Sequence, residues 1–275
     1  MAPAMHASMY NNPILKENIE KLKDLGVRFI EPDIIEGKAK VASIDKTLSV
    51  IINFFKSKLR GKKLLITAGA TYEAIDDVRI ITNKSSGKMG IEIVKEALLR
   101  GAEVTLIYGR ISVDLPKGCK TIKVESTEDL LNKVKEEILR ENYNSVILAG
   151  APSDFKVENK FQGKIDSRKE DRIEITLIRT PKIIEEIRKM NKDLKLVAFK
   201  AEYNLTDEEL IKKARDFLKL TGADLVVAND VARPLAGFEK DTNEVFIVSK
   251  EGWVNNFKGS KSFIASKILD LLNFH

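Results

Sequence analysis

The chain has 275 residues, of which 43% are hydrophobic and 32% charged, and its formal net charge is +6. This balance supplies a hydrophobic core for one large domain or two modest ones and excludes a disordered chain. The single Cys119 excludes a disulfide framework and favours the cytoplasm. The apolar stretches are far shorter than the roughly 20 residues that a membrane helix needs, so we expect no membrane partner.

The first 60 residues contain two helical patterns. The spacing of apolar residues over 14–25 predicts a helix that ends at Gly26. The apolar run over 27–30 predicts a short strand, and a second helix is expected over 44–59.

From Lys62 onward, strands and helices alternate. Short β-branched runs predict strands at 63–67, 103–107, 145–149, 194–199 and 224–228. Helical spacing predicts helices at 87–100, 127–141, 181–190, 206–221 and 260–273. Repeated βα units with apolar strands predict an α/β fold, a Rossmann-like, mostly parallel sheet with helices on both faces.

Two segments depart from this alternation. Residues 172–178 alternate strictly between polar and apolar side chains, which predicts a strand or hairpin arm beside the lysine-rich stretch 156–171. Residues 244–248 and 253–254 flank a Glu-Gly pair, which predicts a hairpin at one edge of the sheet. These segments add a short antiparallel extension to the fold.

Small residues follow the first strand of the repeating region, at Thr67–Thr71 and again within 82–90, where a helix opens. Ligands of parallel α/β sheets collect at the carboxyl ends of the strands. Small residues there let backbone amides approach phosphate oxygens, and Lys84 and Lys88 add positive charge. The same residues also suit a serine cap with ordinary turn glycines, and they match neither the Walker A loop nor the dinucleotide fingerprint.

A lone aspartate, Asp154, follows the third strand. It suits a ribose, base or metal contact and a turn cap alike. Lys164 follows in a basic stretch with Lys156, Lys160 and Arg168. Such a stretch is a solvated loop or, over an active site, a lid that brings a cation onto transferred phosphates.

Three later positions each have a structural and a functional interpretation. Thr180 and Pro181 predict a helix start, with threonine as the cap and proline at the first helical position. The amides of that helix either bind an anion or are simply capped. Phe199 suits the core or a nucleotide base, and residues 229–230 suit a turn or a polar pocket wall.

Together and in this order, the segments resemble the phosphopantothenate–cysteine ligase half of the bifunctional coenzyme A biosynthesis protein, over about residues 62–272. The strings that carry the resemblance are 66–71, Asp76 with Val78-Arg79, 83–90, Asp154-Phe155, Lys164-Ile165, Thr180-Pro181, Phe199, Ala201-Glu202, 228–230, Gly237-Phe238, Asp241 and Asn243. The Ser-Ser-Gly-Lys-Met-Gly string and the Ala-Asn-Asp … Gly-Phe series are the most specific.

The resemblance divides the chain into two parts. Residues 61–275 are similar to the nucleotide-dependent ligase domain, and residues 1–60 look like the tail of the flavin-dependent decarboxylase half with a linker. The string Pro3–His6 is similar to that half's substrate clamp, with His6 where Asn is usual. Because the flavin-binding body would lie upstream, we expect a fragment or shortened form that does not bind FMN alone, with the decarboxylase domain as its partner in a full-length protein.

The resemblance implies a cytoplasmic enzyme of coenzyme A biosynthesis that uses CTP. The carboxylate of 4′-phosphopantothenate attacks the α-phosphate of CTP and releases pyrophosphate, and the amine of cysteine then displaces CMP from the acyl-cytidylate. Mg²⁺ and lysines would neutralise the charge of the triphosphate during this attack. The family also implies a homodimer, joined through the strand near 172–178.

Residue roles follow by match to the family's motifs. The catalytic residues are Asn83, which hydrogen-bonds the substrate or intermediate, and Lys164, which stabilises the phosphates. The residues expected to line the nucleotide pocket are Gly69, Gly150, Ala151, Asp154, Lys164, Pro181, Lys182, Ile183, Ile184 and Phe199. Those expected to bind the substrate are Asn83, Ser85, Ser86, Gly87, Lys88 and Met89. Asp154 is the expected base or ribose contact, and no carboxylate cluster identifies metal ligands.

Two departures from the family leave an ATP-using ligase open beside the CTP-using one. Residues 165–167 stand where many relatives carry a basic run, and Phe217 and Thr221 stand where they often carry lysines, with Lys219 nearby. A non-catalytic module that binds a nucleotide or nucleic acid is an alternative carried only by the net charge and the lysine-rich loop. A nicotinamide-dependent oxidoreductase fits the fold but lacks the glycine fingerprint. The ligase is the leading hypothesis, and it assigns the positive charge to anionic small molecules rather than to nucleic acid.

Overall fold

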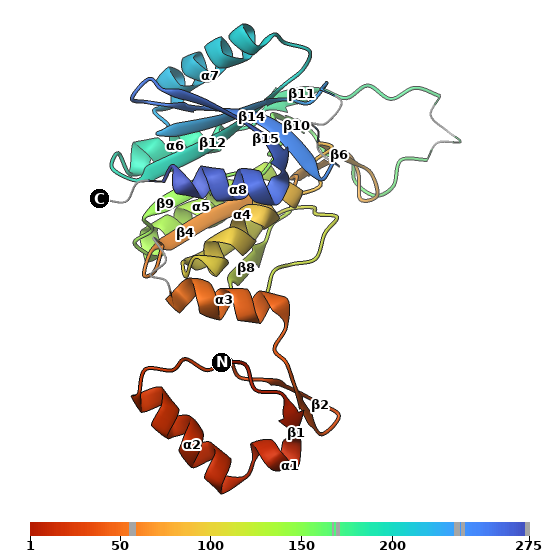
Figure 1. The fold of residues 1–275 in the computed structure, drawn as a ribbon. Helices are drawn as coiled ribbons and strands as arrows, with labels where there is room; N and C mark the ends of the chain where they lie inside the picture. Colours follow the sequence, from red (N-terminus) through yellow and green to blue (C-terminus); the bar gives the residue numbers. More distant parts are fainter. Residues whose placement is uncertain (55–58, 167, 169–170, 234–236, 238–239, 273–275) are drawn as a thin grey trace. The chain divides into compact units, whose positions relative to one another are not determined.

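The computed structural model describes residues 1–54, 59–166, 168, 171–233, 237 and 240–272. The chain divides into two compact units, residues 1–60 with 99–101 and residues 61–98 with 102–275. We call the first the small unit and the second the large unit; Figure 1 draws both.

The small unit combines short helices with a three-stranded antiparallel sheet in which β3 lies between β1 and β2. Its elements are β1 (Met5–His6), α1 (Ala7–Tyr10), α2 (Pro13–Asp24), β2 (Asp33–Ile35), β3 (Lys38–Lys40) and α3 (Ile44–Phe54). The first predicted helix is confirmed as α2. Pro13 occupies its first turn, and the Asn12 side chain accepts a hydrogen bond from the Ile14 amide at 2.9 Å.

The strand predicted over 27–30 is wrong. The Val27 amide donates to the Leu22 carbonyl and the Ile30 amide to the Met1 carbonyl, each at 2.9 Å, and residues 27–30 belong to no described strand. The Met1 amino group also donates to the Arg28 carbonyl at 2.7 Å. Two bonds to one terminal residue are not a ladder, so this apolar run follows an irregular path. The second predicted helix begins at Ile44 as expected and is described as far as Phe54; residues 55–58 lie outside the described residues.

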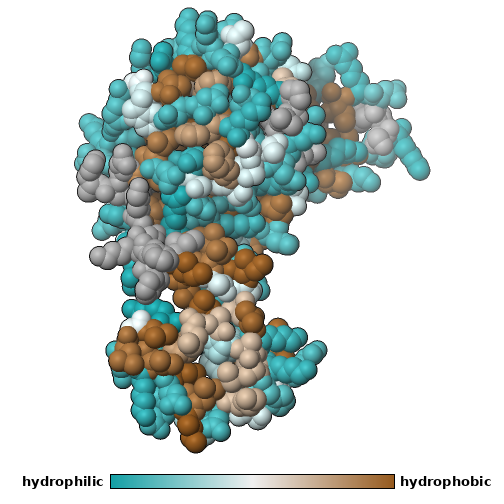
Figure 2. Space-filling model, viewed as in Figure 1, coloured by the Kyte–Doolittle hydropathy of each residue, from teal (hydrophilic) through white to brown (hydrophobic). Residues whose placement is uncertain are grey.

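Many large apolar side chains of the small unit are exposed. Its buried apolar residues include Ile30, Ala39 and Ala42. The exposed ones are Met1, Met9, Ile14, Leu25, Ile34, Ile35, Val41, Ile44, Leu48 and Ile51. Figure 2 shows such apolar surface in brown over this unit. The elements of the small unit are therefore too short and too few to cover one another.

The large unit is built on an eight-stranded sheet with the order β15-β14-β13-β12-β9-β4-β7-β8. Its parallel strands are β4 (Lys63–Ala68), β7 (Glu103–Tyr108), β8 (Lys120–Lys123), β9 (Ser145–Leu148), β12 (Lys195–Glu202) and β13 (Leu225–Asp230). The antiparallel strands at one edge are β14 (Thr242–Ser249) and β15 (Val254–Ser260). The predicted strands, the edge hairpin and the α/β class are confirmed, and β8 is an addition at the other edge.

Helices cover both faces of this sheet. They are α4 (Lys88–Leu99), α5 (Thr127–Arg140), α6 (Ile183–Met190), α7 (Asp207–Thr221) and α8 (Lys261–Asp270). Leu131 of α5, Ile187 of α6 and Leu210 of α7 share one core cluster with alternate residues of the strands. Ile93 of α4 and Ile264 of α8 are also buried but lie outside that cluster, because α4 and α8 pack on the opposite face, in front of the sheet in Figure 1. Among the described residues, no helix is both long and apolar enough to cross a bilayer.

The chain changes face between two neighbouring strands. Strand β4 leads into α4 on one face, whereas the adjacent β9 leads to α6 on the other. The loops that leave the carboxyl ends of β4 and β9 therefore diverge. This is a topological switch point, the place where open α/β sheets bind ligands.

Two short antiparallel ladders extend the large unit. They are β5 (Tyr72–Ala74) with β6 (Ile80–Thr82), and β10 (Phe155–Val157) with β11 (Leu177–Arg179). The strand predicted over 172–178 is therefore largely wrong, because it begins only at Leu177. Strand β10 offers partners to Leu177–Arg179 alone, and the Glu158 amide adds one bond to the Thr176 carbonyl at 3.0 Å. The alternating pattern upstream has no ladder to join.

Candidate functional site

The loops after β4 and β9 meet at the switch point. The Ala151 amide donates to the Gly69 carbonyl at 2.7 Å. The Gly150 amide donates to Thr67 Oγ1 at 3.0 Å. The Asn83 side chain donates to the Ala151 carbonyl at 3.3 Å. Four predicted site residues from three segments, Gly69, Asn83, Gly150 and Ala151, are thus brought together by hydrogen bonds.

A cluster of buried hydroxyl groups supports this junction. Thr71 Oγ1 lies 2.9 Å from Thr127 Oγ1 and accepts a hydrogen bond from the Ser153 amide at 2.8 Å. The hydroxyls of Thr127 and Thr180 donate to the Ser153 carbonyl at 3.2 and 2.6 Å. All four residues are buried, so the loss of one partner would leave a polar group without water. The cluster fixes the backbone that leads into Asp154.

The predicted start of α6 is wrong by two residues. Thr180 is not its cap, because its hydroxyl donates to the Ser153 carbonyl and its amide donates to the Asp154 carbonyl at 3.1 Å. The helix begins at Ile183, and Lys182 stands at the cap position without a side-chain hydrogen bond. The fold brings the Ser153 carbonyl close to Thr180, and the hydrogen bond between them replaces the local capping bond that the Thr-Pro pair predicts.

The expected nucleotide segment 181–184 is divided between core and surface. Ile183 and Ile184 are only 5% and 7% exposed and belong to the core cluster, so their side chains are not available to a ligand. Pro181 and Lys182 are exposed, and Lys182 Nζ lies 2.6 Å from Asp154 Oδ1. The expected base contact Asp154 therefore already holds a cation at the surface.

Two glycines at the junction are required by close packing. Gly69 and Gly87 both have φ of +76°, in the region that favours glycine. A Cβ at Gly69 would lie 2.3 Å from the Arg110 carbonyl oxygen, and one at Gly87 would lie 2.4 Å from Ile111 Cγ2. The loop after β4 and the start of α4 therefore both press against residues 110–111. Packing by itself accounts for these glycines.

The rest of the expected substrate string forms a tight turn into α4. Ser86 is buried, and its carbonyl accepts a hydrogen bond from the Ser112 amide at 3.0 Å. The Ser85 hydroxyl accepts a hydrogen bond from the Gly87 amide at 3.4 Å. Met89 is half-buried in the first turn of the helix. These residues lie directly after Asn83 and so share its side of the junction.

Lys88, at the start of α4, belongs to a charged group that the sequence motifs did not reveal in full. Lys88 Nζ lies 2.6 Å from Asp241 Oδ1, and this bond lowers the pKa of Asp241. Lys261, the first residue of α8, is 5% exposed and donates to the carbonyls of Gly237, at 3.0 Å, and Lys240. Burial and the charge of Lys88 lower the pKa of Lys261 to about 8. No motif marks Lys261, which only the fold brings near Lys88.

Phe199 stands apart from the other predicted residues. It lies in β12 opposite Val227. Its neighbour Ala198 belongs to the core cluster on the α5–α7 face, so the pleat turns Phe199 to the opposite face. Ile183 and Ile184 pack on the α5–α7 face. The structure does not bring Phe199 together with them.

Lys164 lies on the loop that follows β10. Its side chain is exposed, and no described residue forms an ion pair with it. The amides on either side of it, those of Gly163 and Ile165, donate to carboxylates in the turn between β5 and β6. Strand β6 ends directly before Asn83. One hairpin therefore supports both predicted catalytic residues, although no hydrogen bond links the two side chains.

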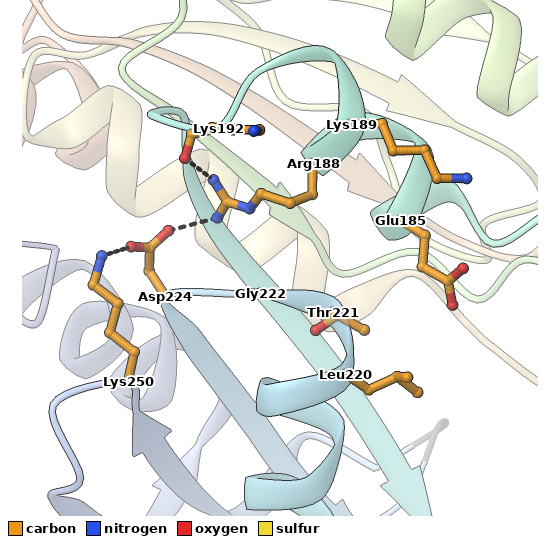
Figure 3. Close-up of a pocket in the computed structure, with 9 residues that line it drawn as sticks. All are labelled: Glu185, Arg188, Lys189, Lys192, Leu220, Thr221, Gly222, Asp224 and Lys250. Atoms are coloured by element: carbon orange, nitrogen blue, oxygen red, sulfur yellow. Dashed lines mark hydrogen bonds and ion pairs between the residues drawn. The ribbon is translucent and has the colours of Figure 1, made fainter.

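A separate pocket of about 600 Å³ lies near the amino ends of β12 and β13 (Figure 3). Its lining residues are Glu185, Arg188, Lys189, Lys192, Leu220, Thr221, Gly222, Asp224 and Lys250. Arg188 Nη2 lies 3.0 Å from Asp224 Oδ2, and Lys250 pairs with the other carboxylate oxygen. Burial favours a raised pKa for Asp224, but its partners hold that pKa below the ordinary value. None of the predicted site residues lines this pocket, at the opposite end of the sheet from the switch point.

The residues present do not make a dedicated metal site. In the described parts of the chain, no three His, Cys, Asp or Glu side chains gather where they could hold a cation. Mg²⁺ is commonly carried by substrate phosphates with one or two carboxylates. The described residues therefore offer the expected Mg²⁺ no set of three protein ligands.

Sequence comparison relates the two parts of the chain to two families. Residues 59–274 match the family described as DNA/pantothenate metabolism flavoprotein C-terminal domain, and residues 1–56 match the family described as Flavoprotein. The coenzyme A biosynthesis bifunctional protein CoaBC of Thermococcus kodakarensis is 49% identical over 253 residues, which cover 91% of this chain and 61% of that protein. The chain thus spans less than two thirds of the length of this relative.

Two solved structures resemble the chain at more than a quarter identity. The C-terminal domain of a coenzyme A biosynthesis bifunctional protein CoaBC has a TM-score of 0.64 and 32% identity, covering 78% of this chain and 95% of that domain. The DNA/pantothenate metabolism flavoprotein from Streptococcus pneumoniae has a TM-score of 0.67 and 30% identity, covering 76% of this chain and 97% of that one. Both likenesses agree with the α/β fold of the chain.

Proposed function

This chain belongs to the family of the DNA/pantothenate metabolism flavoprotein C-terminal domain, and from that premise we propose that it acts in coenzyme A biosynthesis as a phosphopantothenate–cysteine ligase. The observation that carries the proposal is the meeting of Gly69, Asn83 and Ala151 at the switch point between β4 and β9. Open α/β sheets bind their ligands at such points. The 49% identity to a bifunctional protein of coenzyme A biosynthesis supports the same substrates.

The reaction has two steps. A carboxylate oxygen of 4′-phosphopantothenate attacks the α-phosphorus of the nucleotide, and the bond to pyrophosphate breaks. The amine of cysteine then attacks the acyl carbon, the bond to the nucleoside monophosphate breaks, and the amine loses a proton to solvent. Activation is needed because a free carboxylate is a poor electrophile at neutral pH.

The chain's own residues supply charge and hydrogen bonds. The Lys164 ammonium stabilises the negative charge that develops on the phosphate oxygens during activation. The Asn83 amide, which donates to the Ala151 carbonyl, also donates to the acyl oxygen of the intermediate. The nucleotide is contacted by backbone groups at Gly69 and Gly150 and by the Asp154 carboxylate. The Lys182 ammonium, which pairs with Asp154, then pairs with a phosphate of the nucleotide instead.

We expect CTP to be the nucleotide, with ATP as the competing candidate. The feature that leaves ATP open is the replacement of a basic residue by Phe217 on α7. Thr221, the second such position, lines the separate pocket at the other end of the sheet. Lys200 Nζ lies 5.5 Å from the centre of the Phe217 ring, so a cation does occupy that neighbourhood, supplied by β12 instead of α7. Comparison of the two nucleotides in one assay decides between them.

A homodimer fits the exposed arm made of β10, β11 and their flanks. Large apolar side chains lie at its surface: Phe155, Ile173, Ile175, Leu177 and Ile178. Phe155, Leu177 and Ile178 belong to the ladder, and Ile173 and Ile175 precede it in the chain. The large unit alone leaves all five exposed. A second copy of the chain would cover them.

Residues 1–56 are proposed to be the end of a flavin-dependent decarboxylase domain. The apolar surface of the small unit suits a segment that packs against such a domain. The His6 ring accepts a hydrogen bond from the Ser8 amide at 3.4 Å and so caps α1.

The ligase is tested by incubating the chain with phosphopantothenate, cysteine, Mg²⁺ and either CTP or ATP, and measuring pyrophosphate. We expect release with CTP, and a loss of about 100-fold or more in the Lys164→Gln variant. Asn83→Asp is expected to slow the consumption of the acyl-nucleotide. Lys117→Gln, at an exposed lysine, is the charge-matched control and should keep the full rate. No pyrophosphate with either nucleotide would contradict the proposed function.

A further inference from the structure

The loop that carries Lys164 is bound to one particular turn of the molecule, residues 75–79 between β5 and β6. The Phe161 amide donates to the Ile75 carbonyl at 2.9 Å. The Asp77 amide donates to the Gly163 carbonyl at 3.1 Å. The loop and the turn are thus held together by backbone bonds just before Lys164.

Two adjacent carboxylates complete this attachment on either side of Lys164. The Gly163 amide donates to Asp77 Oδ2 at 2.9 Å, and the Ile165 amide donates to Asp76 Oδ2 at 3.1 Å. The Arg79 guanidinium also donates to the Ile165 carbonyl at 3.3 Å. The peptide groups before and after Lys164 are therefore both fixed, while its side chain is left exposed.

The two carboxylates differ in their surroundings. Asp76 is 2% exposed and also accepts hydrogen bonds from the Val78 and Arg79 amides. Burial by itself favours a raised pKa for Asp76, but its many donors hold that pKa far below the ordinary value. Asp77 is exposed, and the Lys160 ammonium 2.6 Å away lowers its pKa. Both groups are therefore ionised acceptors at neutral pH.

Each carboxylate also has a cationic partner of its own. Arg79 pairs with Asp76 and Lys160 pairs with Asp77. These pairs offset two negative charges that would otherwise lie close to Lys164 and weaken its attraction for an anion. Among the described residues, the Lys164 ammonium has no ion pair, so its charge stays available.

We propose that Asp76 and Asp77 are positioning residues that hold the backbone of Lys164 in place for the attack on the nucleotide, with Arg79 and Lys160 offsetting their charge. The proposal rests on the proposed function, because it gives Lys164 its task. It assigns a role to Asp77, a residue outside the strings by which the family was recognised. A lysine on an unattached loop would reach the phosphates only part of the time, and misplacement by about 1 Å can cost about 100-fold in rate.

Asp77 is the better residue to change, because Asp76 is buried under several donors and its replacement risks unfolding. Asp77→Ala removes both the acceptor for the Gly163 amide and the partner of Lys160. Asp77→Asn keeps an acceptor oxygen of the same shape and removes only the charge. Asp114→Asn removes a charge from another exposed loop residue and is the matched control.

The first measurement is hydrogen exchange at the Gly163 and Ile165 amides, which requires no activity. We expect faster exchange at Gly163 in Asp77→Ala, a smaller change in Asp77→Asn and none in Asp114→Asn. Unchanged exchange at Gly163 in Asp77→Ala would overturn the attachment itself, whether or not the chain is a ligase.

The second measurement is a double-mutant cycle with Lys164→Gln, read as the rate of pyrophosphate release. We expect Asp77→Ala to lower kcat about 10- to 100-fold at unchanged thermal midpoint, Asp77→Asn to restore most of it, and Asp77→Ala to have no further effect in the Lys164→Gln background. If the losses in kcat of Asp77→Ala and Lys164→Gln add in the double variant, the positioning role is overturned. It is also overturned if Asp77→Ala exchanges the Gly163 amide faster but keeps the full rate of pyrophosphate release. If the unaltered chain releases no pyrophosphate, the proposed function fails, while the exchange result still decides whether the carboxylates hold the loop.

Discussion

The small unit and the large unit use apolar residues in opposite ways. In the large unit, apolar strands are covered on both faces, and side chains such as Leu65, Ile147 and Leu196 are fully buried. In the small unit, comparable side chains such as Ile14 and Leu25 are 69% and 80% exposed. The difference follows from layers: a sheet with helices on two faces closes over its own core, whereas a few short elements have nothing to close against.

The largest expected difference between the units is the cost of removing an apolar side chain. Ile147→Ala in β9 should destabilise the large unit by about 2–5 kcal/mol, because it leaves a cavity in a close-packed core. Ile14→Ala in α2 should change the stability of the small unit by less than about 0.5 kcal/mol. Trp253, the single tryptophan, lies between β14 and β15, so its fluorescence in denaturant reports on the large unit. Equal costs for the two substitutions would remove the contrast.

A second pair of variants separates backbone conformation from packing. Gly26 in the small unit has φ of +88° and nothing within 4 Å of an added Cβ, so Gly26→Ala should cost only the left-handed conformation, about 1–2 kcal/mol. Gly69→Ala should cost more, because its Cβ would also meet the Arg110 carbonyl at 2.3 Å. Hydrogen exchange in each unit measures both effects. If Gly69→Ala lost no more stability than Gly26→Ala, the backbone around Gly69 would have to shift to accommodate the added Cβ.

Helix caps give a smaller effect that the two units share. Thr206 caps α7 in a reciprocal bond with Glu209, and Asn12 caps α2. Replacing either by Ala should cost about 1 kcal/mol, since capping is a local bond that does not depend on a core. For Thr206→Ala, the test is the denaturation midpoint measured by Trp253 fluorescence. For Asn12→Ala, the test is hydrogen exchange of the α2 amides. A cost confined to one unit would mean that caps depend on their tertiary surroundings.

A last difference from the small unit concerns pH. The pKa of Lys261 falls from 10.5 to about 8 on folding, so the folded chain releases this proton first. Between these values the unfolded chain holds more protons, and stability contributed by this group rises with pH. In Lys261→Met that contribution disappears, so urea midpoints between pH 8 and 10.5 should rise less steeply than in the unaltered chain. Identical slopes would contradict the burial of the charged ammonium.

The sequence predicted the repeating elements of the large unit closely and its irregular ones poorly. Strands such as 63–67 were predictable because a fully covered parallel strand is an apolar run bounded by turn residues. The pattern over 172–178 misled because alternation requires a partner strand, and β10 pairs only as far as Leu177. Thr180 misled because its hydroxyl found the Ser153 carbonyl across the fold.

The candidate site also combines residues that the sequence predicted well with residues that it assigned wrongly or missed. The glycines and Asn83 are marked by strings of sequence, and the hydrogen bonds at the switch point join them. Ile183 and Ile184 were assigned to the nucleotide by position, yet they are core residues. Lys261 had no signal at all, because a lysine at the start of a helix is ordinary until the fold buries it.

The sequence by itself determined the succession of strands and helices along the chain, the family, and the segments that contain the family's motifs. These features depend on residues close together in the chain. Only the tertiary structure decided which of those segments meet. The Ile165 amide reaches an Asp76 carboxylate that is 89 residues away, and Lys88 reaches an Asp241 that is 153 residues away. Such pairs exist because the strand order places β4 beside β9 and turns the loops toward one edge, and no local pattern encodes that order.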